Sequence, residues 1–352
     1  MKRSLILFSI ISLIIFAEKT YCMPWPPEMD ICYVKFNYQS GHTYDALTLK
    51  KNSSTTIVAP EWANGGSTNE KIAYIKSQSN RKIKVKLWLD RTGVVVEAYA
   101  TQSGQGIGNT NTQWFDFLST QYSDERIMTF NSSVPSSVGK RSFTLQWYAT
   151  FLGFDDNSYY WIGNTGAHYY YTLLAAPQSP MTKPWTSVLD YAGVWASGKT
   201  SETTALTAIT QGAYNSFDVV YNTDITYSSG TSCNLTGLLN STSADCRDMS
   251  AIVQIFTNAL GGSNIQVRRI DGPFDTKLIS PIGKGWTSYT GEIEWNYHQV
   301  GWKSNVWDAC IRLDYNNPRI PVNENINGSY KNDLYFLGAW TPLTATKYTS
   351  VY

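Results

Sequence analysis

Residues 82–89 read Lys-Ile-Lys-Val-Lys-Leu-Trp-Leu and alternate polar and apolar side chains through most of their length. A period of two places successive side chains on opposite faces of a strand, so one face can be buried while the other meets water. Residues 94–100 follow across an Asp-Arg-Thr-Gly turn, and residues 143–148 alternate again. This pattern predicts an antiparallel β-sandwich domain over residues 23–175, with an immunoglobulin-like topology but without the Cys-Trp-Cys spacing of antibody domains.

The pattern changes after residues 175–180, where Ala-Ala-Pro-Gln-Ser-Pro predicts a linker. Residues 221–243 are rich in Ser, Thr, Asn and Gly and predict a loop. Helical periodicity and cap signals predict helices over residues 185–196, 202–214 (capped by Thr200 or Ser201) and 246–260. Strands are predicted over residues 265–270, 292–300 and 306–313. Helices followed by antiparallel strands predict an α+β domain over residues 176–352.

The length and the charge of the chain restrict the possibilities further. A chain of 352 residues is longer than one hydrophobic core usually covers, which favours two domains. The formal net charge is +1, so the chain has no basic surplus that would indicate nucleic-acid binding. We expect no nucleic-acid partner.

The N-terminal residues have the pattern of a targeting segment. Lys2 and Arg3 precede an apolar run over residues 5–17, which is shorter than the ~20 residues needed to span a bilayer. This predicts a signal peptide over residues 1–22, with an uncleaved N-terminal anchor as the alternative. No later segment is apolar enough to form a transmembrane helix. We therefore expect a mature protein that is secreted, periplasmic or at the cell surface.

Five cysteines are present, and in an exported protein each is first considered as a disulfide partner. With Cys246 reserved for chemistry, Cys32, Cys233 and Cys310 leave an odd thiol, and the sequence assigns no pairing. His42 and His168 have no metal-ligand partner at a useful spacing. We therefore expect both to be surface or packing residues, and we expect no metal site.

Cys246 opens the clearest predicted helix of the chain. A thiol at a helix N-terminus faces the positive end of the helix dipole and free N–H groups, which stabilise a thiolate and can bind an oxyanion. Arg247 favours the thiolate, whereas Asp245 and Asp248 oppose it, and Asp245 can also serve as the N-cap. Cys246 lies at the rim of the apolar face of the helix, which favours access by substrate.

His298 and Asp308 lie on two predicted strands joined by a short turn. A loop centred on Lys303 would place Asp308 directly opposite His298, and a loop one residue different would move it to the other face. In the first register Asp308 would hold Nδ1 of the imidazole and leave Nε2 for the thiol. Asp314 is the reserve carboxylate, and Cys310 is expected to pack beside the site.

Residues 185–315 resemble the transglutaminase-like superfamily, whose fold is papain-like. Residues 245–249 (Asp-Cys-Arg-Asp-Met) look like the Cys motif of its bacterial members. Residues 295–298 (Trp-Asn-Tyr-His) are similar to a Trp-Asn-Phe-His run of animal transglutaminases, and residues 306–309 resemble their strand ending in Leu-Asp-Ala. The chain departs from the family after His298, where Gln-Val-Gly-Trp follows, and in its shorter His-to-Asp interval.

The resemblance implies Cys246 as nucleophile, His298 as general base and acid, Asp308 as the residue that orients the imidazole, and Trp295 as a substrate-binding residue. It implies no metal or organic cofactor and a protein or peptide substrate, with hydrolysis favoured over cross-linking. The alternative is a catalytically inactive binding or adhesion protein of the cell envelope, whose aromatic residues contact peptide or glycan. A purely structural surface module is a third reading.

Overall fold

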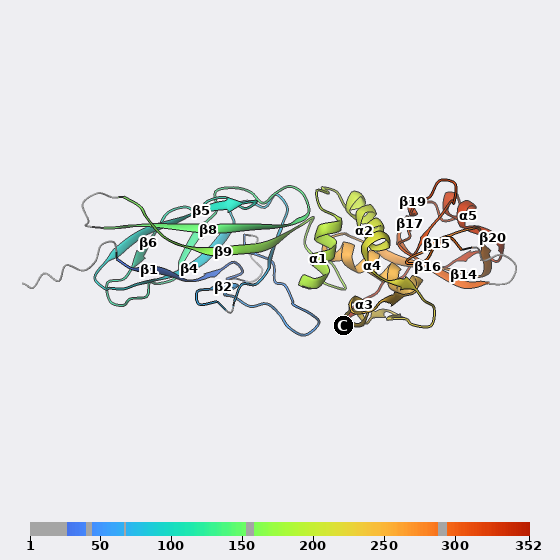
Figure 1. The fold of residues 1–352 in the computed structure, drawn as a ribbon, viewed down its shortest axis with the longest axis horizontal. Coiled ribbons are helices and arrows are strands. Elements are labelled where there is room, and N and C mark those ends of the chain that lie inside the picture. Colours follow the sequence, from blue (N-terminus) through green and yellow to red (C-terminus); the bar gives the residue numbers. More distant parts are fainter. Residues whose placement is uncertain (1–26, 40–43, 67, 153–157, 288–293) are drawn as a thin grey trace, which may run out of the picture.

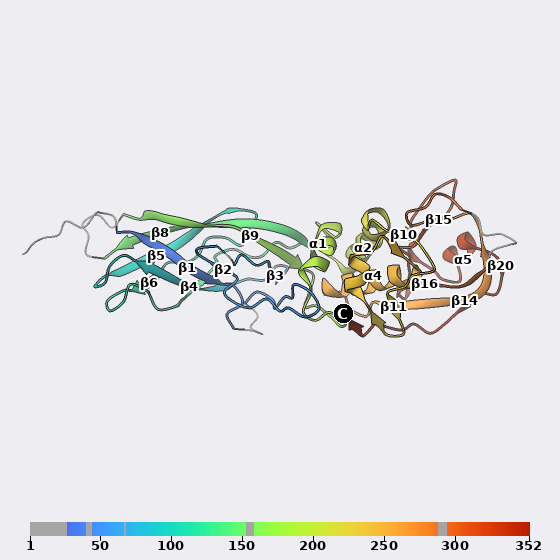
Figure 2. The ribbon, with the colours of Figure 1, turned by 60° about the horizontal axis from the view of Figure 1, so that its bottom comes forward.

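The computed structural model describes residues 27–39, 44–66, 68–152, 158–287 and 294–352. The predicted signal peptide, with Cys22, and His42 lie outside these residues. Figures 1 and 2 show an elongated molecule, with the strands of the first half at one end and the second half at the other. The fold is mixed α+β and rich in strands. Within the described ranges, no helix has the length and apolar character needed to cross a membrane.

Two sheets build the first half, with strand orders β2-β1-β4-β7 and β3-β9-β8-β5-β6. The strands are β1 (Met29–Lys35), β2 (Trp62–Ala63), β3 (Ile72–Ile75), β4 (Lys82–Leu89), β5 (Val95–Gly104), β6 (Gln113–Asp116), β7 (Arg126–Thr129), β8 (Gly139–Phe151) and β9 (Tyr160–Leu173). β4 has the predicted bounds, and its burial alternates at every residue. Apolar side chains of both sheets, among them Val85 and Trp147, share one buried core.

The pairing in these two sheets differs in one place from the predicted antiparallel sandwich. β3 runs parallel to β9, with Ile72 paired to Tyr170, whereas the other paired strands described in this half are antiparallel. The parallel pair forms because β3 adds to the sheet edge beside β9 after a long connection, not through a hairpin. The immunoglobulin-like topology stays a prediction.

The helices of the second half are α1 (Thr186–Trp195), α2 (Glu202–Ser216), α3 (Leu235–Leu239), α4 (Cys246–Ala259) and α5 (Ser329–Leu334). In the second half α1 to α4 precede the strands of the main sheet, as predicted, whereas α5 lies between two of those strands. Ser201 is the N-cap of α2, accepting a hydrogen bond from the Thr204 N–H. α4 is enclosed on nearly all sides, since even Gln254 and Asn258 are buried. It is therefore the central element of this half.

The main sheet of the second half has the order β19-β17-β16-β14-β20, and β21 also pairs with β14. Its strands are β14 (Gln266–Thr276), β16 (Trp295–Lys303), β17 (Asn305–Trp307), β19 (Val322–Glu324), β20 (Tyr335–Gly338) and β21 (Thr341–Pro342). The smaller strands are β10 (Val220–Tyr221), β11 (Ser228–Ser229), β12 (Ser232–Cys233), β13 (Ser243–Ala244), β15 (Ser280–Pro281), β18 (Ile311–Arg312) and β22 (Ser350–Val351).

Residues 221–243, predicted as loop, contain β11, β12 and α3. The prediction was wrong because these elements span two to five residues, too few to establish a periodic pattern. The predicted strand over residues 306–313 is also interrupted, since β17 ends at Trp307 and β18 begins at Ile311. Asp308 lies in that interruption.

The backbone of the predicted linker is hydrogen-bonded to the second half of the molecule. The N–H of Ala175 donates to Leu260 O at 3.4 Å, and that of Gln178 to Asn258 O at 2.9 Å, so the segment lies against the end of α4. Tyr171 of β9 packs into the core of the second half and donates its hydroxyl to Asp190 of α1. The two halves therefore share apolar and polar contacts. The domain boundary at residue 175 stays a prediction.

Candidate active site

Cys246 is the first residue of α4, and its cap is built from carboxylates. The side chain of Asp245 accepts the N–H of Asp248 at 3.0 Å, and the side chain of Asp248 accepts the N–H of Asp245 at 3.3 Å. Burial and the charge of Asp245 raise the pKa of Asp248 to about 6. Arg247 pairs with Asp245 at 2.8 Å, so its charge compensates that of the cap.

His298 lies on β16, which packs directly against the helix that carries Cys246. A Cβ atom at Gly301 would lie 2.5 Å from Cγ1 of Val253 on α4, closer than real contacts allow. Glycine at this position therefore lets the strand approach the helix. The approach brings the fully buried His298 beside the start of α4.

The hairpin between His298 and Asp308 turns at Ser304, whose φ is 63°, not at the predicted Lys303. Trp302 pairs with Val306. If this register continued along both strands, Val300 and not His298 would lie opposite Asp308. The prediction of direct opposition was wrong. The turn centre lies one residue later than predicted, so the position opposite Asp308 shifts by two residues, from His298 to Val300. Because side chains alternate between faces with a period of two, Asp308 stays on the face of the sheet that His298 shares.

Asp308 meets His298 although it lies beyond the ladder. Its Oδ2 is 2.9 Å from Nε2 of His298, and both side chains are almost fully buried. The Tyr330 hydroxyl donates to the same Oδ2 at 2.7 Å, and the N–H of Cys310 donates to Oδ1 at 2.8 Å. The sequence did not predict Tyr330 as part of the site, because no motif connects it to Asp308, 22 residues earlier.

The two ring nitrogens of His298 have the opposite roles to those predicted. Nε2 faces Asp308, and Nδ1 is buried without a hydrogen-bond partner among the described residues. Burial lowers the pKa of His298, but the charge and hydrogen bond of Asp308, followed by those of Cys246, raise it to about 10. Both neighbours therefore favour the charged ring, and Nδ1 is the nitrogen that does not face Asp308.

The other described cysteines differ from Cys246. Cys32, Cys233, Cys246 and Cys310 are all free, so none of the four is joined by a disulfide. Burial raises the pKa of Cys233 to about 12 and that of Cys32 to about 11. Burial and the nearby Asp308 raise the pKa of Cys310 well above its usual range. As predicted, Cys310 packs beside the site, and burial keeps its thiol protonated.

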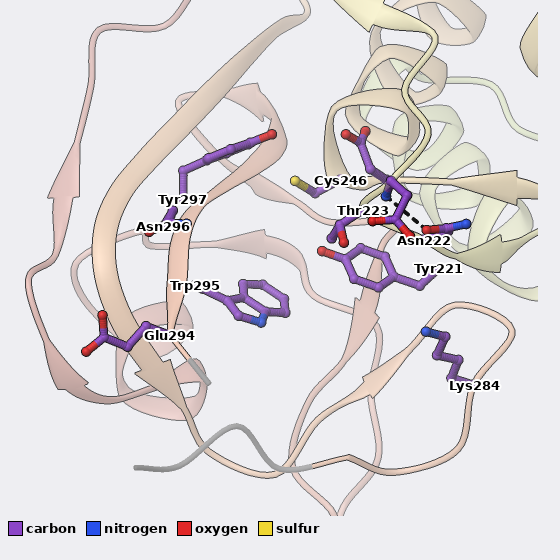
Figure 3. A pocket seen from close by; sticks show the side chains of 11 residues that line it. Tyr221, Asn222, Thr223, Cys246, Lys284, Glu294, Trp295, Asn296 and Tyr297 are labelled. Carbon is purple, nitrogen blue, oxygen red and sulfur yellow. Dashed lines mark hydrogen bonds between the residues drawn. The ribbon is translucent and has the colours of Figure 1, made fainter. Parts of the chain in front are cut away.

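A cavity of about 520 Å³ opens at Cys246. Figure 3 shows the thiol reaching from the start of α4, with the rings of Tyr221 and Trp295 beside it. These rings are stacked, with centroids 6.2 Å apart and planes at 16°, and the Trp295 ring also lies 4.8 Å from that of His298. Further lining residues are Asn222, Thr223, Asp224, Asp245, Lys284, Glu294, Asn296 and Tyr297. Cys246 lines this cavity but is only 3% exposed, so the predicted accessible position at the rim of the helix was wrong.

The remaining sequence candidates lie elsewhere. His168 is buried among Phe36, Trp62 and Phe143 in the first half, a packing residue as predicted. Asp314, the reserve carboxylate, lies 3.7 Å from Arg319 and accepts the N–H of Asn317. In the described ranges no group of three or more His, Cys, Asp or Glu side chains could hold a metal ion.

No family model matches the chain, and no curated protein does. Among solved structures, a red sea bream transglutaminase is similar, with a TM-score of 0.33 and 8% sequence identity. The match covers 67% of this chain and 47% of that protein, so the chain spans less than half of its length. At this level the likeness carries no argument about function.

Proposed function

We propose that the chain is a cysteine acyl-transfer enzyme of transglutaminase-like type that acts on peptide or carboxamide bonds. Cys246 is the nucleophile, His298 the general acid and base, and Asp308 the orienting carboxylate. Trp295 lines the acyl-binding cavity. The observation that carries the proposal is the buried contact of His298 with Asp308 at 2.9 Å, since His298 lies on the strand that packs against the helix beginning at Cys246.

The charges support an ion pair of thiolate and imidazolium. His298 holds a proton at neutral pH because Asp308 and Cys246 favour its charged form despite burial. A cation beside a thiol and the dipole at a helix N-terminus both stabilise the thiolate. The nucleophile would therefore be charged before substrate arrives, without a separate base to activate it.

Cys246 supplies the nucleophile of the proposed reaction, and His298 gives and takes the protons. The Cys246 thiolate adds to the carbonyl carbon, and N–H groups of the first turn of α4 can stabilise the oxyanion. The imidazolium of His298 then gives its proton to the leaving amine as the C–N bond breaks. Water next loses a proton to the neutral imidazole and attacks the thioester, which releases the acid and restores the thiolate.

We propose hydrolysis rather than cross-linking as the main outcome. Polar side chains line the cavity next to Cys246, including Asn222, Thr223 and Asn296, and they can hold water near a thioester. An amine-donor incorporation assay run beside peptide cleavage separates the two outcomes. Excess amine incorporation would reassign the chain as a transferase.

Selective alkylation of Cys246 tests the proposal without a known substrate. At pH 5.5 an ordinary thiol with a pKa of about 8.5 is almost fully protonated and reacts slowly with iodoacetamide. We expect Cys246 to be alkylated at least about tenfold faster than Cys32, as read by peptide mass spectrometry. His298→Ala should abolish this preference, and His168→Gln, at the other buried histidine, should retain it.

Unreactive Cys246 in a folded protein would contradict the enzyme and favour the alternative, an inactive binding protein of the cell envelope. Equal labelling in the wild type and in His298→Ala would have the same meaning, because it would show a thiol that is merely accessible. Circular dichroism of each variant establishes that the fold is retained.

A further inference from the structure

We propose that Tyr330 is a positioning residue of this site, whose hydroxyl holds Asp308 aimed at His298. This inference rests on the proposed function and extends the site from three side chains to four. Tyr330 touches neither the cavity nor the thiol. It would act entirely through Asp308.

The hydrogen bonds of Asp308 carry the argument. Tyr330 donates its hydroxyl to Oδ2 at 2.7 Å, shorter than the 2.9 Å contact of His298 with the same oxygen. The N–H of Cys310 occupies Oδ1 at 2.8 Å. Asp308 is 1% exposed, so these protein donors replace the water that would otherwise solvate the carboxylate.

The hydroxyl of Tyr330 is distinct from the packing role of its ring. The ring lies in the core of the second half, with its centroid 6.2 Å from that of Trp340, and phenylalanine would fill the same space. A buried phenol needs a partner for its O–H, and here the partner is the catalytic carboxylate. Burial and the charge of Asp308 raise the pKa of Tyr330 well above its usual range, so the phenol stays a donor.

A donor to a carboxylate favours its charged form. Without the Tyr330 hydroxyl, Asp308 would lose a donor to its charged form, and its hold on the imidazolium of His298 would loosen. The thiolate of Cys246 would then lose its counter-charge at a pH where the wild type still reacts. Tyr330 therefore sets the lower pH limit of the reactive state.

The test is the pH profile of Cys246 alkylation in Tyr330→Phe. We expect its acid limb to move up by about one pH unit, with little change in the rate at the plateau. Tyr335→Phe is the matched control, because Tyr335 borders the same helix and donates its hydroxyl to Gly338 O, away from Asp308. A Tyr330→Phe profile that overlays the wild type would overturn the proposal.

A second readout separates failure of this inference from failure of the proposed function. The carboxyl carbon of Asp308, assigned in ¹³C-aspartate protein with Asp308→Asn, should titrate at higher pH in Tyr330→Phe whether or not Cys246 reacts. An unchanged midpoint would refute the role of Tyr330 alone. Loss of His298-dependent alkylation in the wild type would refute the function alone.

If Tyr330→Phe does not fold, a fluorotyrosine inserted at position 330 tests the same bond in the opposite direction. Its more acidic phenol is a stronger donor and fills almost the same volume. We expect the Asp308 titration and the acid limb of alkylation to move to lower pH. A shift to higher pH, or none, would contradict the proposal.

Discussion

The two halves of the molecule each enclose a histidine, and the two imidazoles end in opposite charge states. His168, in the first half, is 1% exposed and contacts the hydroxyl of Thr165 at 2.6 Å. Burial lowers its pKa to about 3. His298, in the second half, is fully buried, yet Asp308 and Cys246 overcome burial and raise its pKa to about 10.

The difference shows that the neighbours of a buried imidazole decide its charge, since burial is the same in both places. A hydroxyl and aromatic rings stabilise the neutral ring of His168, which serves packing. A carboxylate stabilises the charged ring of His298 and leaves one nitrogen for the thiol. Four sets of variants test this difference between the two sites.

The largest effect is expected when the carboxylate is removed. Asp308→Ala leaves a buried imidazole without its counter-charge and should cost about 3–5 kcal/mol of unfolding free energy at pH 7. Urea denaturation measures this loss. Asp314→Ala, at the partly exposed reserve carboxylate, should cost under about 1 kcal/mol. Equal costs would mean that the charge of His298 does not depend on Asp308.

The second prediction concerns the dependence of stability on pH, to which the two histidines contribute with opposite signs. His298 binds its proton more tightly in the folded state, so its stabilisation is complete below pH 6.5 and is lost as pH rises through about 10. His168 binds its proton more weakly when folded, so stability is lost as pH falls from 6.5 toward about 3. For each histidine, the unfolding free energy changes by at most about 1.4 kcal/mol per pH unit.

Single substitutions separate these two slopes. His298→Gln should flatten the alkaline side of the stability profile, and His168→Gln should flatten the acid side. Urea unfolding at a series of pH values gives both. If His298→Gln left the alkaline slope unchanged, the charged state of His298 would be wrong.

The third effect is smaller and lies in the first half. Thr165→Val removes the hydroxyl beside His168 and should cost about 1–3 kcal/mol, because a buried ring nitrogen loses its partner. The ring should remain neutral at pH 7, since no carboxylate takes the place of the hydroxyl. A His168 that becomes charged in this variant, seen by NMR, would contradict the contrast.

The smallest effect is expected for a charge pair that solvent can reach. Asp190 joins the halves through Lys71 at 2.6 Å and Lys140 at 2.7 Å, with all three side chains about one-third exposed. Lys71→Met should therefore change the unfolding free energy by less than about 1 kcal/mol. A loss as large as that of Asp308→Ala would show that exposure does not separate the two kinds of pair.

Local patterns were sufficient to predict several elements. The alternation of residues 82–89 gave β4 at its observed bounds, and the helix predicted from Cys246 ends one residue beyond α4. These features depend on side-chain periodicity over consecutive residues, which a sequence displays directly. The order of thiol, imidazole and carboxylate was also visible, as was the placement of Cys246 at the start of a helix and of His298 on a strand.

Geometry that depends on the rest of the chain could not be predicted in this way. The left-handed conformation of Ser304 set a turn centre different from the expected one, and β17 ends before Asp308, whose N–H bonds to Pro321 O. Tyr330 reaches Asp308 from a short helix that no local signal connects to the site. Long-range packing decides such contacts, and a single sequence does not encode them in a readable pattern.

The most direct test of the account is the protonation of His298 at pH 7 by ¹⁵N NMR of the imidazole rings, with His168 as the internal comparison. We predict that both ring nitrogens of His298 carry protons and that His168 is neutral. Assignment comes from His298→Gln and His168→Gln. A neutral His298 at pH 7 would contradict the central claim, because the thiol would then have no cation beside it.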